Sequence, residues 1–252
     1  MSIFLNVACL AARRYRPCLG LQTGSGKLVW LNMEWYEAEV RALERLRKAR
    51  PHVNAPAVFY GSSTIRLWNT MAQDLGDRRA LNLGFGGSTL EACFWFFERL
   101  VPPERPCSLV VYAGDNDLGD GQQPDAVVAS FRALAARVNR WCPGISFGFI
   151  SIKPSPARRY LQDSICRTND MIRRETDRIE NAYFIPVFDA MLDGSGNPRR
   201  ELYAEDQLHL APAGYQLWAQ LLRPYCNRIF ISNSDPCNPA SLSSGQGEPR
   251  IS

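Results

Sequence analysis

The chain has 252 residues, of which 46% are hydrophobic and 21% are charged, and this composition suits one large α/β domain with a buried core. The formal net charge is only +4, from 29 Lys and Arg against 25 Asp and Glu, so the composition does not indicate a nucleic-acid partner. No apolar run approaches the roughly 20 residues that a membrane span needs.

Eight cysteines have no CxxC pair and no regular spacing, and most of them lie in apolar segments, as free buried thiols do. This usage favours a reducing compartment over a disulfide framework, so we expect a cytoplasmic protein. Residues 1–32 show no clear hydrophobic period, and residues 231–252 are rich in Ser, Pro, Gly and Asn. We therefore expect an N-terminal extension over 1–32, one domain over 33–230 and a disordered tail over 231–252.

Between these ends, helical patterns alternate with short apolar runs. The first helix is expected over 35–50, where Trp35, Val40, Leu43 and Leu46 recur at helical spacing. Strands are expected over 57–61, 80–83, 108–113, 145–152 and 183–188. Further helices are expected over 64–74, from a Ser88 or Thr89 cap to 100, over 124–141, from 156 towards 180, and over 213–226. This alternation predicts a parallel sheet with helices on both faces.

Two serines follow the first predicted strand directly. The strand ends at Gly61, and Ser62 and Ser63 come next. Ligands of open α/β sheets bind beyond the carboxyl ends of the strands, so a serine at this place is a candidate nucleophile. Taken alone, the stretch is better explained as a turn whose serines cap the next helix.

A serine nucleophile needs a base, and the chain contains two histidines. His52 precedes the sheet, where a solvated surface role is favoured. Asp206 lies three residues before His209, so one turn can bring both side chains to the same side. The carboxylate would then orient the imidazole while it accepts the proton of Ser63. The alternative is that Asp206 caps a turn and His209 is only packed.

Acyl transfer also needs donors aimed at the developing oxyanion. Gly86 and Gly87 allow close approach of the backbone and offer free N–H groups before a helix, and the side chain of Asn116 can add a donor. Turn glycines and an Asx turn at Asn116 are the simpler alternatives. Because all the simpler interpretations would have to hold together, an acyl-transfer site is the preferred hypothesis.

Four motifs carry a resemblance to a known family. They are Gly61-Ser62-Ser63, Gly84-Phe85-Gly86-Gly87-Ser88, Gly114-Asp115-Asn116-Asp117 and Asp206-Gln207-Leu208-His209. Through them, residues 35–226 resemble the SGNH hydrolases, also called GDSL-type esterases, and most closely the branch similar to platelet-activating-factor acetylhydrolase. The family's usual Asp before the nucleophile is Ser62 in this chain. That departure concerns the geometry of the turn more than the chemistry.

The resemblance implies a flavodoxin-like α/β/α sandwich with a five-stranded parallel sheet. It also implies a serine esterase that acts on a small-molecule ester with a short acyl group, most simply acetyl, without cofactor or metal. By the same resemblance, Ser63 is the nucleophile, His209 the base and Asp206 its orienter. The oxyanion would be held by the N–H groups of Ser63 and Gly87 and by the side chain of Asn116. The segment 151–158 also resembles this branch, so Lys153 or Arg158 lies either near the substrate entrance or in a solvated loop.

Four other classes compete with this hypothesis. The α/β-hydrolase nucleophile elbow is disfavoured because Ile65 occupies its last glycine position. A dinucleotide site is disfavoured because Thr89 stands where the third glycine should be. A metal phosphoesterase could use Asp115, Asp117 and His209, but no second ligand cluster accompanies them. A non-catalytic relative that binds carbohydrate or lipid remains an alternative.

Overall fold

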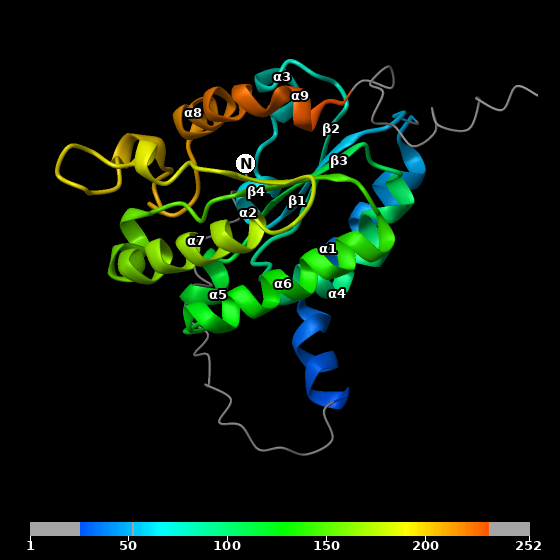
Figure 1. The fold of residues 1–252 in the computed structure, drawn as a ribbon, viewed down its shortest axis with the longest axis horizontal. Coiled ribbons are helices and arrows are strands. Elements are labelled where there is room, and N and C mark those ends of the chain that lie inside the picture. Colours follow the sequence, from blue (N-terminus) through cyan, green and yellow to red (C-terminus); the bar gives the residue numbers. More distant parts are fainter. Residues whose placement is uncertain (1–25, 52, 232–252) are drawn as a thin grey trace, which may run out of the picture.

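The computed structural model of the chain describes residues 26–51 and 53–231, with side chains from Met33 onward (Figure 1). His52, residues 1–25 and residues 232–252 lie outside the described residues. Three predictions fall wholly or mostly on these parts of the chain. They are a surface role for His52, a separate N-terminal extension and a disordered tail.

Five parallel strands form the centre of the structure. They are β1 (Ala57–Gly61), β2 (Ala80–Gly84), β3 (Ser108–Tyr112), β4 (Ser146–Ile150) and β5 (Ala182–Ile185), in the spatial order β2-β1-β3-β4-β5. This is the flavodoxin-like order, so the predicted fold class is confirmed. The last strand ends three residues before its predicted end because Pro186, which follows it, has no N–H to donate to the sheet.

Helices cover both faces of the sheet. The α-helices are α1 (Gly26–Ala49), α2 (Ser63–Arg66), α3 (Met71–Asp74), α4 (Leu90–Leu100), α5 (Asp115–Gly119), α6 (Pro124–Trp141), α7 (Gln162–Thr176), α8 (Pro212–Leu222) and α9 (Cys226–Ile229). The 3-10 helices of the described residues are η1 (Pro102–Glu104), η2 (Pro156–Leu161), η3 (Asp189–Met191), η4 (Arg200–Leu202) and η5 (Arg223–Tyr225). Figure 1 shows α4, α6 and α7 on one face and α3, α8 and α9 on the other.

The buried core has two parts, one on each side of the sheet. Within β1, Val58 and Tyr60 belong to the core under α1, α4 and α6, whereas Ala57 and Phe59 belong to the core under α8. Successive side chains of a strand point to opposite faces, and here both faces are covered. This explains why the strands read as continuous apolar runs in the sequence.

The helix predicted over 64–74 is instead two short helices, α2 and α3. The side chain of Asn82 donates to the Ile65 carbonyl at 2.6 Å and lies 3.4 Å from the Trp68 carbonyl. These are carbonyls that a continuous helix would use for its own hydrogen bonds. A long-range contact from β2 therefore replaces the helical continuation.

The apolar stripe of α1 differs from the predicted one. Trp35 and Leu46 are 77% and 63% exposed, whereas Met33 and Val40 are buried. Tyr36 packs partly buried against the same core as Met33 and Val40. Val40 and Leu43 therefore pack on this core as predicted, whereas Trp35 and Leu46 remain on the surface.

The described cysteines are free, but they are less buried than expected. Cys93 is buried, Cys166 is exposed, and the other three are half-buried. Among the described residues, no helix is long and apolar enough to cross a membrane.

Candidate active site

Ser63 is placed by the turn between β1 and α2. It is the first residue of α2, and the preceding Ser62 donates its backbone N–H to the Tyr112 carbonyl of β3 at 2.9 Å. The Ser62 hydroxyl is buried and has no partner among the described residues, so it is not the one presented to the site. The Ser63 hydroxyl instead lies 2.9 Å from Nε2 of His209.

The imidazole of His209 connects Ser63 with Asp206. Its Nδ1 lies 2.5 Å from Oδ2 of Asp206. The other carboxylate oxygen, Oδ1, accepts the backbone N–H groups of Leu208 and His209, each at 3.0 Å. The structure thus combines both interpretations of Asp206, because the carboxylate caps its turn and also contacts the imidazole.

The surroundings of Asp206 favour its ionised form. Partial burial acts to raise the pKa of this carboxyl, but the hydrogen bonds from the His209 side chain and two backbone N–H groups outweigh burial and hold the pKa below its usual value. An ionised carboxylate holds a proton on Nδ1 of His209. In the neutral imidazole, Nε2 is then the proton acceptor that faces Ser63.

The glycine loop after β2 is held by α1. Gly86 donates its N–H to Oε2 of Glu39 at 2.6 Å, and the Tyr36 hydroxyl donates to the Gly87 carbonyl at 3.1 Å. Gly87 has a φ of +68°, which glycine adopts without strain. Within the described part of the chain, the N–H groups of Gly87 and Ser63 have no acceptor. Of the two glycine N–H groups expected to be free, only that of Gly87 is available.

Asn116 follows β3 and is the second residue of α5, a short helix that the sequence did not predict. Its Nδ2 donates to the Ser88 carbonyl at 3.1 Å, which places the amide beside the loop that carries Gly87. Its Oδ1 accepts a hydrogen bond from Arg158 at 3.1 Å. One hydrogen of Nδ2 stays available, so the side chain can still serve as a donor.

The two aspartates beside Asn116 are bound within the protein. Both oxygens of Asp117 lie 3.1 Å from the N–H of Leu90 at the start of α4, and burial raises the pKa of Asp117 to about 7. Asp115 pairs with Arg158 and Lys153 at 3.3 and 3.5 Å. Within residues 33–51 and 53–231, no His, Cys, Asp and Glu side chains are grouped so as to hold a metal ion.

Neither basic residue of the segment 151–158 lies in a solvated loop. Lys153 is only 2% exposed, so the alternative of a solvated loop is wrong for this residue. Its ammonium group is buried together with the carboxylate of Asp115, with which it pairs at 3.5 Å. Arg158 has an 18% exposed side chain and contacts Asn116 directly.

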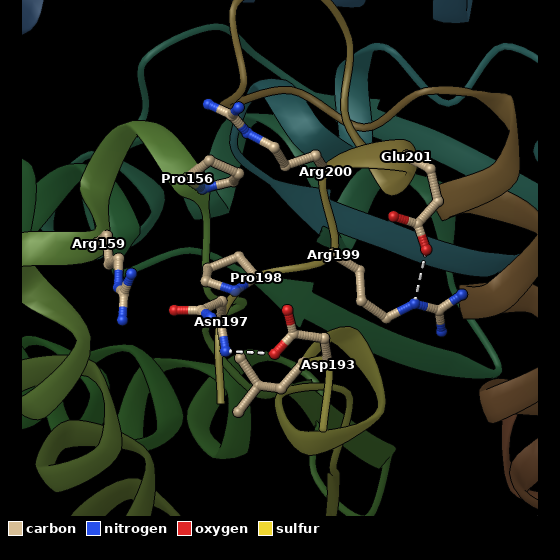
Figure 2. Close-up of a pocket in the computed structure, with 9 residues that line it drawn as sticks. Pro156, Arg159, Asp193, Asn197, Pro198, Arg199, Arg200 and Glu201 are labelled. Carbon is tan, nitrogen blue, oxygen red and sulfur yellow. Dashed lines mark hydrogen bonds and ion pairs between the residues drawn. The ribbon is translucent and has the colours of Figure 1, made fainter. Parts of the chain in front are cut away.

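A cavity of about 820 Å³ lies outside this constellation, between η2 and residues 192–201 (Figure 2). Figure 2 shows Arg199 turned towards Glu201, with which it pairs at 2.9 Å, and Arg159 on the opposite wall. Ser63 and His209 are not among the described residues that line this cavity. The cavity is therefore distinct from the place where Ser63 and His209 meet.

The sheet order defines a flavodoxin-like α/β protein. At the carboxyl edge of its sheet, the side chains of Ser63, His209 and Asp206 form one site. Residues 43–217 match the family model of the GDSL-like lipase/acylhydrolase family. Because the match spans more than half of the chain, the protein belongs to this family of hydrolases. The predicted resemblance to SGNH hydrolases is thereby confirmed.

Solved structures with the same fold agree with this assignment. A structure from Streptococcus pneumonia, provisionally described as a platelet activating factor, is 22% identical over 79% of this chain and 98% of its own, with a TM-score of 0.66. A GDSL-like lipase from Bacteroides thetaiotaomicron is 20% identical over 77% and 96%, with a TM-score of 0.61. The acetyl xylan esterase AlAXEase is 18% identical over 66% and 98%, with a TM-score of 0.56. A comparison with curated proteins gave no match.

Proposed function

We propose that the protein is a serine esterase that hydrolyses small esters with short acyl groups, most simply acetyl, through an acyl-enzyme. The observation that carries this proposal is the continuous chain of contacts from the Ser63 hydroxyl through His209 to Asp206, at 2.9 and 2.5 Å. A hydroxyl, a base and an orienting carboxylate in this order are the parts that nucleophilic acyl transfer requires.

In the first half-reaction, Oγ of Ser63 attacks the ester carbonyl carbon while its proton moves to Nε2 of His209. The carbonyl oxygen takes up the electron pair and becomes an oxyanion. When the tetrahedral intermediate collapses, the bond to the alcohol oxygen breaks and His209 returns the proton to that oxygen. Asp206 stabilises the imidazolium in between and does not itself take the proton.

In the second half-reaction, His209 takes a proton from water, and the hydroxide oxygen attacks the acyl-enzyme carbonyl. Collapse of the second intermediate releases the acid and returns the proton to Ser63. In both steps the oxyanion accepts hydrogen bonds from the N–H groups of Ser63 and Gly87 and from Nδ2 of Asn116. Fixed donors of this kind stabilise charge only as it develops in the transition state.

The short acyl group is supported by similarity alone. The chain resembles the acetylhydrolase branch of the family, and one structure with the same fold is called an acetyl xylan esterase. A series of p-nitrophenyl esters from acetate to octanoate tests this part of the proposal. We expect kcat/KM to be highest for acetate, and a maximum at hexanoate or longer would contradict it.

Labelling with a fluorophosphonate, followed by peptide mapping, tests the nucleophile. We expect the label on Ser63, no label after Ser63→Ala, and full labelling after Ser62→Ala. Ser62 is a matched control because it is the adjacent serine and its hydroxyl has no partner among the residues described. No labelling of the native protein would contradict the proposal and favour a non-catalytic binding protein. Labelling of Ser62 would contradict the assignment of Ser63 as the nucleophile.

We also propose a reducing, cytoplasmic compartment, because the five described cysteines are free. Thiol titration of the denatured protein, isolated without reductant under trapping conditions, should give all eight thiols of the sequence. A lower number that rises after reduction would contradict this location.

A further inference from the structure

We propose that Arg158 is a positioning residue for the oxyanion hole, because its guanidinium holds the amide of Asn116 with Nδ2 turned towards the Gly87 loop. This inference rests on the proposed function, in which Asn116 donates to the oxyanion. Arg158 itself does not need to touch the substrate. It acts through the orientation and polarity of another side chain.

The contacts of Asn116 fix which end of its amide faces which neighbour. Oδ1 lies 3.1 Å from the guanidinium of Arg158, and Nδ2 lies 3.1 Å from the carbonyl oxygen of Ser88. A guanidinium can only donate, and a carbonyl oxygen can only accept. If the amide rotated by half a turn, donors would face donors and acceptors would face acceptors. Both neighbours therefore favour the orientation that keeps an N–H beside Gly87.

Arg158 is itself held by two successive residues at the start of α5. One guanidinium nitrogen donates to the backbone carbonyl of Asp115 at 2.7 Å and lies 3.3 Å from its carboxylate, and the other bonds Asn116. The planar fork of arginine suits such paired contacts, which lysine cannot reproduce. The buried Lys153 lies 3.5 Å from the same carboxylate oxygen and so helps to hold the Asp115 carboxylate that Arg158 contacts.

The backbone leaves room for this guanidinium. A Cβ at Gly119 would lie 2.8 Å from Cζ and 2.9 Å from Nη2 of Arg158, so any larger residue would displace the arginine. The 3-10 helix η2 is also tied to the histidine loop, because Ala157 donates its N–H to the Gln207 carbonyl at 3.1 Å. Arg158 therefore links the helix of Asn116 to the loop of His209.

A cation on Oδ1 also strengthens Asn116 as a donor. Hydrogen bonds from charged groups are stronger than those between neutral groups, and a bond at one end of an amide polarises the other end. The remaining Nδ2 hydrogen thus carries more positive charge towards the oxyanion. Loss of Arg158 should reduce kcat through both orientation and polarity.

Arg159 provides a matched control. It is the next residue of η2, but it lines the separate cavity, and its side chain forms no ion pair or hydrogen bond with the described residues. Replacing it removes the same charge from the same helix without touching Asn116. Arg159→Ala should therefore keep kcat and KM for p-nitrophenyl acetate near those of the native protein.

The test is a double-mutant cycle on p-nitrophenyl acetate hydrolysis by the full chain. Arg158→Ala should lower kcat by about tenfold or more with KM changed less than about threefold, since one oxyanion donor accounts for about 10²–10³ in kcat. In an Asn116→Ala background, the same substitution should change kcat less than about twofold. Equal losses of kcat in both backgrounds would mean a general structural role and would overturn the inference.

A second variant keeps the test decisive if Arg158→Ala folds poorly. Arg158→Lys retains a cation beside Asp115 but not the fork, so kcat should fall while the melting temperature stays near that of the native protein. Added guanidinium at low millimolar concentration should restore part of kcat in Arg158→Ala and none in Asn116→Ala. Native kcat in Arg158→Lys, or guanidinium activation of both alanine variants, would overturn the inference.

The outcomes also separate this inference from the proposed function. If Asn116→Ala lowers kcat and Arg158→Ala does not, the esterase proposal stands and the inference fails. If Asn116→Ala leaves kcat unchanged, the oxyanion assignment fails and the inference fails with it. If Ser63→Ala keeps native turnover, the proposed function itself is wrong.

Discussion

The two halves of the candidate site are supported in different ways. His209 and Asp206 lie three residues apart, and the backbone N–H groups of their own turn hold the carboxylate in place. Gly87 and Asn116, in contrast, are held by side chains far away in the chain. Tyr36 lies 51 residues before Gly87, and Arg158 lies 42 residues after Asn116. The histidine side is therefore a local arrangement, whereas the oxyanion side depends on the packing of the whole fold.

Substitutions of Ser63 and His209, whose side chains meet at 2.9 Å, should give the largest effects. Ser63→Ala and His209→Ala each remove a group that forms or breaks bonds, so kcat for p-nitrophenyl acetate should fall by about 10⁴-fold or more. The melting temperature should change little, because Ser63 and His209 are only partly buried. Turnover near the native value in either variant would refute the assignment of the triad.

On the oxyanion side, the expected loss is smaller because several donors share the charge. Asn116→Ala should lower kcat by about 10²–10³-fold, as the removal of one oxyanion donor does elsewhere. KM should change less, since the donor acts mainly in the transition state. Steady-state kinetics give both constants, and a loss of kcat below tenfold would reduce Asn116 to a turn residue.

Loss of the contact between α1 and the Gly87 loop should lower kcat less than the loss of Asn116. Tyr36→Phe removes the hydroxyl that donates to the Gly87 carbonyl but keeps the ring packed against Phe85. We expect kcat to fall by roughly tenfold or less, since the loop keeps the contact of Glu39 with Gly86. Tyr160→Phe is the control, because Tyr160 is 77% exposed. Equal kinetics in the two variants would show that α1 does not position the loop.

Substitution of Asp117 should have the smallest effect on activity. Its main effect should be on the pH dependence of the free energy of unfolding. Its pKa of about 7 in the folded protein exceeds the ordinary value of 3.8, so the folded state binds more protons than the unfolded state between these values. The free energy of unfolding contributed by Asp117 therefore falls as the pH rises from about 4 to 7, by up to about 4 kcal/mol.

Asp117→Asn removes this titration while its side-chain oxygen can still accept the N–H of Leu90. Urea unfolding at pH 5 and pH 8 should show that the variant gains stability relative to the native protein at the higher pH. Asp125→Asn is the control, because the Asp125 side chain is 70% exposed. If Asp117→Asn shows the same pH dependence as the native protein, the buried carboxyl is ionised in both states.

The difference between the two halves also explains what the sequence could predict. The five strands and the residues at their carboxyl ends were found because short apolar runs and the polar residues after them are local signals. Asp206 and His209 lie three residues apart, so their contact is likewise predicted from a local signal. The family resemblance added the choice of Ser63 over Ser62, and the structure brings Ser63 to His209.

Long-range contacts explain what the sequence did not predict. The break between α2 and α3 depends on Asn82 of β2, and the exposure of Trp35 depends on how α1 packs on the core. The contact of Arg158 with Asn116 likewise joins two loops that no periodicity relates. The resemblance of segment 151–158 to the family points to Arg158, but the sequence does not reveal which residue it contacts.

The most direct test of the central claim is to trap the acyl-enzyme. The protein is mixed with p-nitrophenyl acetate, quenched in acid within the first turnover, digested and analysed by mass spectrometry. Our account predicts one acetyl group on the peptide that contains Ser63, retained in Ser62→Ala and lost in Ser63→Ala. Hydrolysis that proceeds without an acetylated Ser63 in the quenched native protein would contradict it.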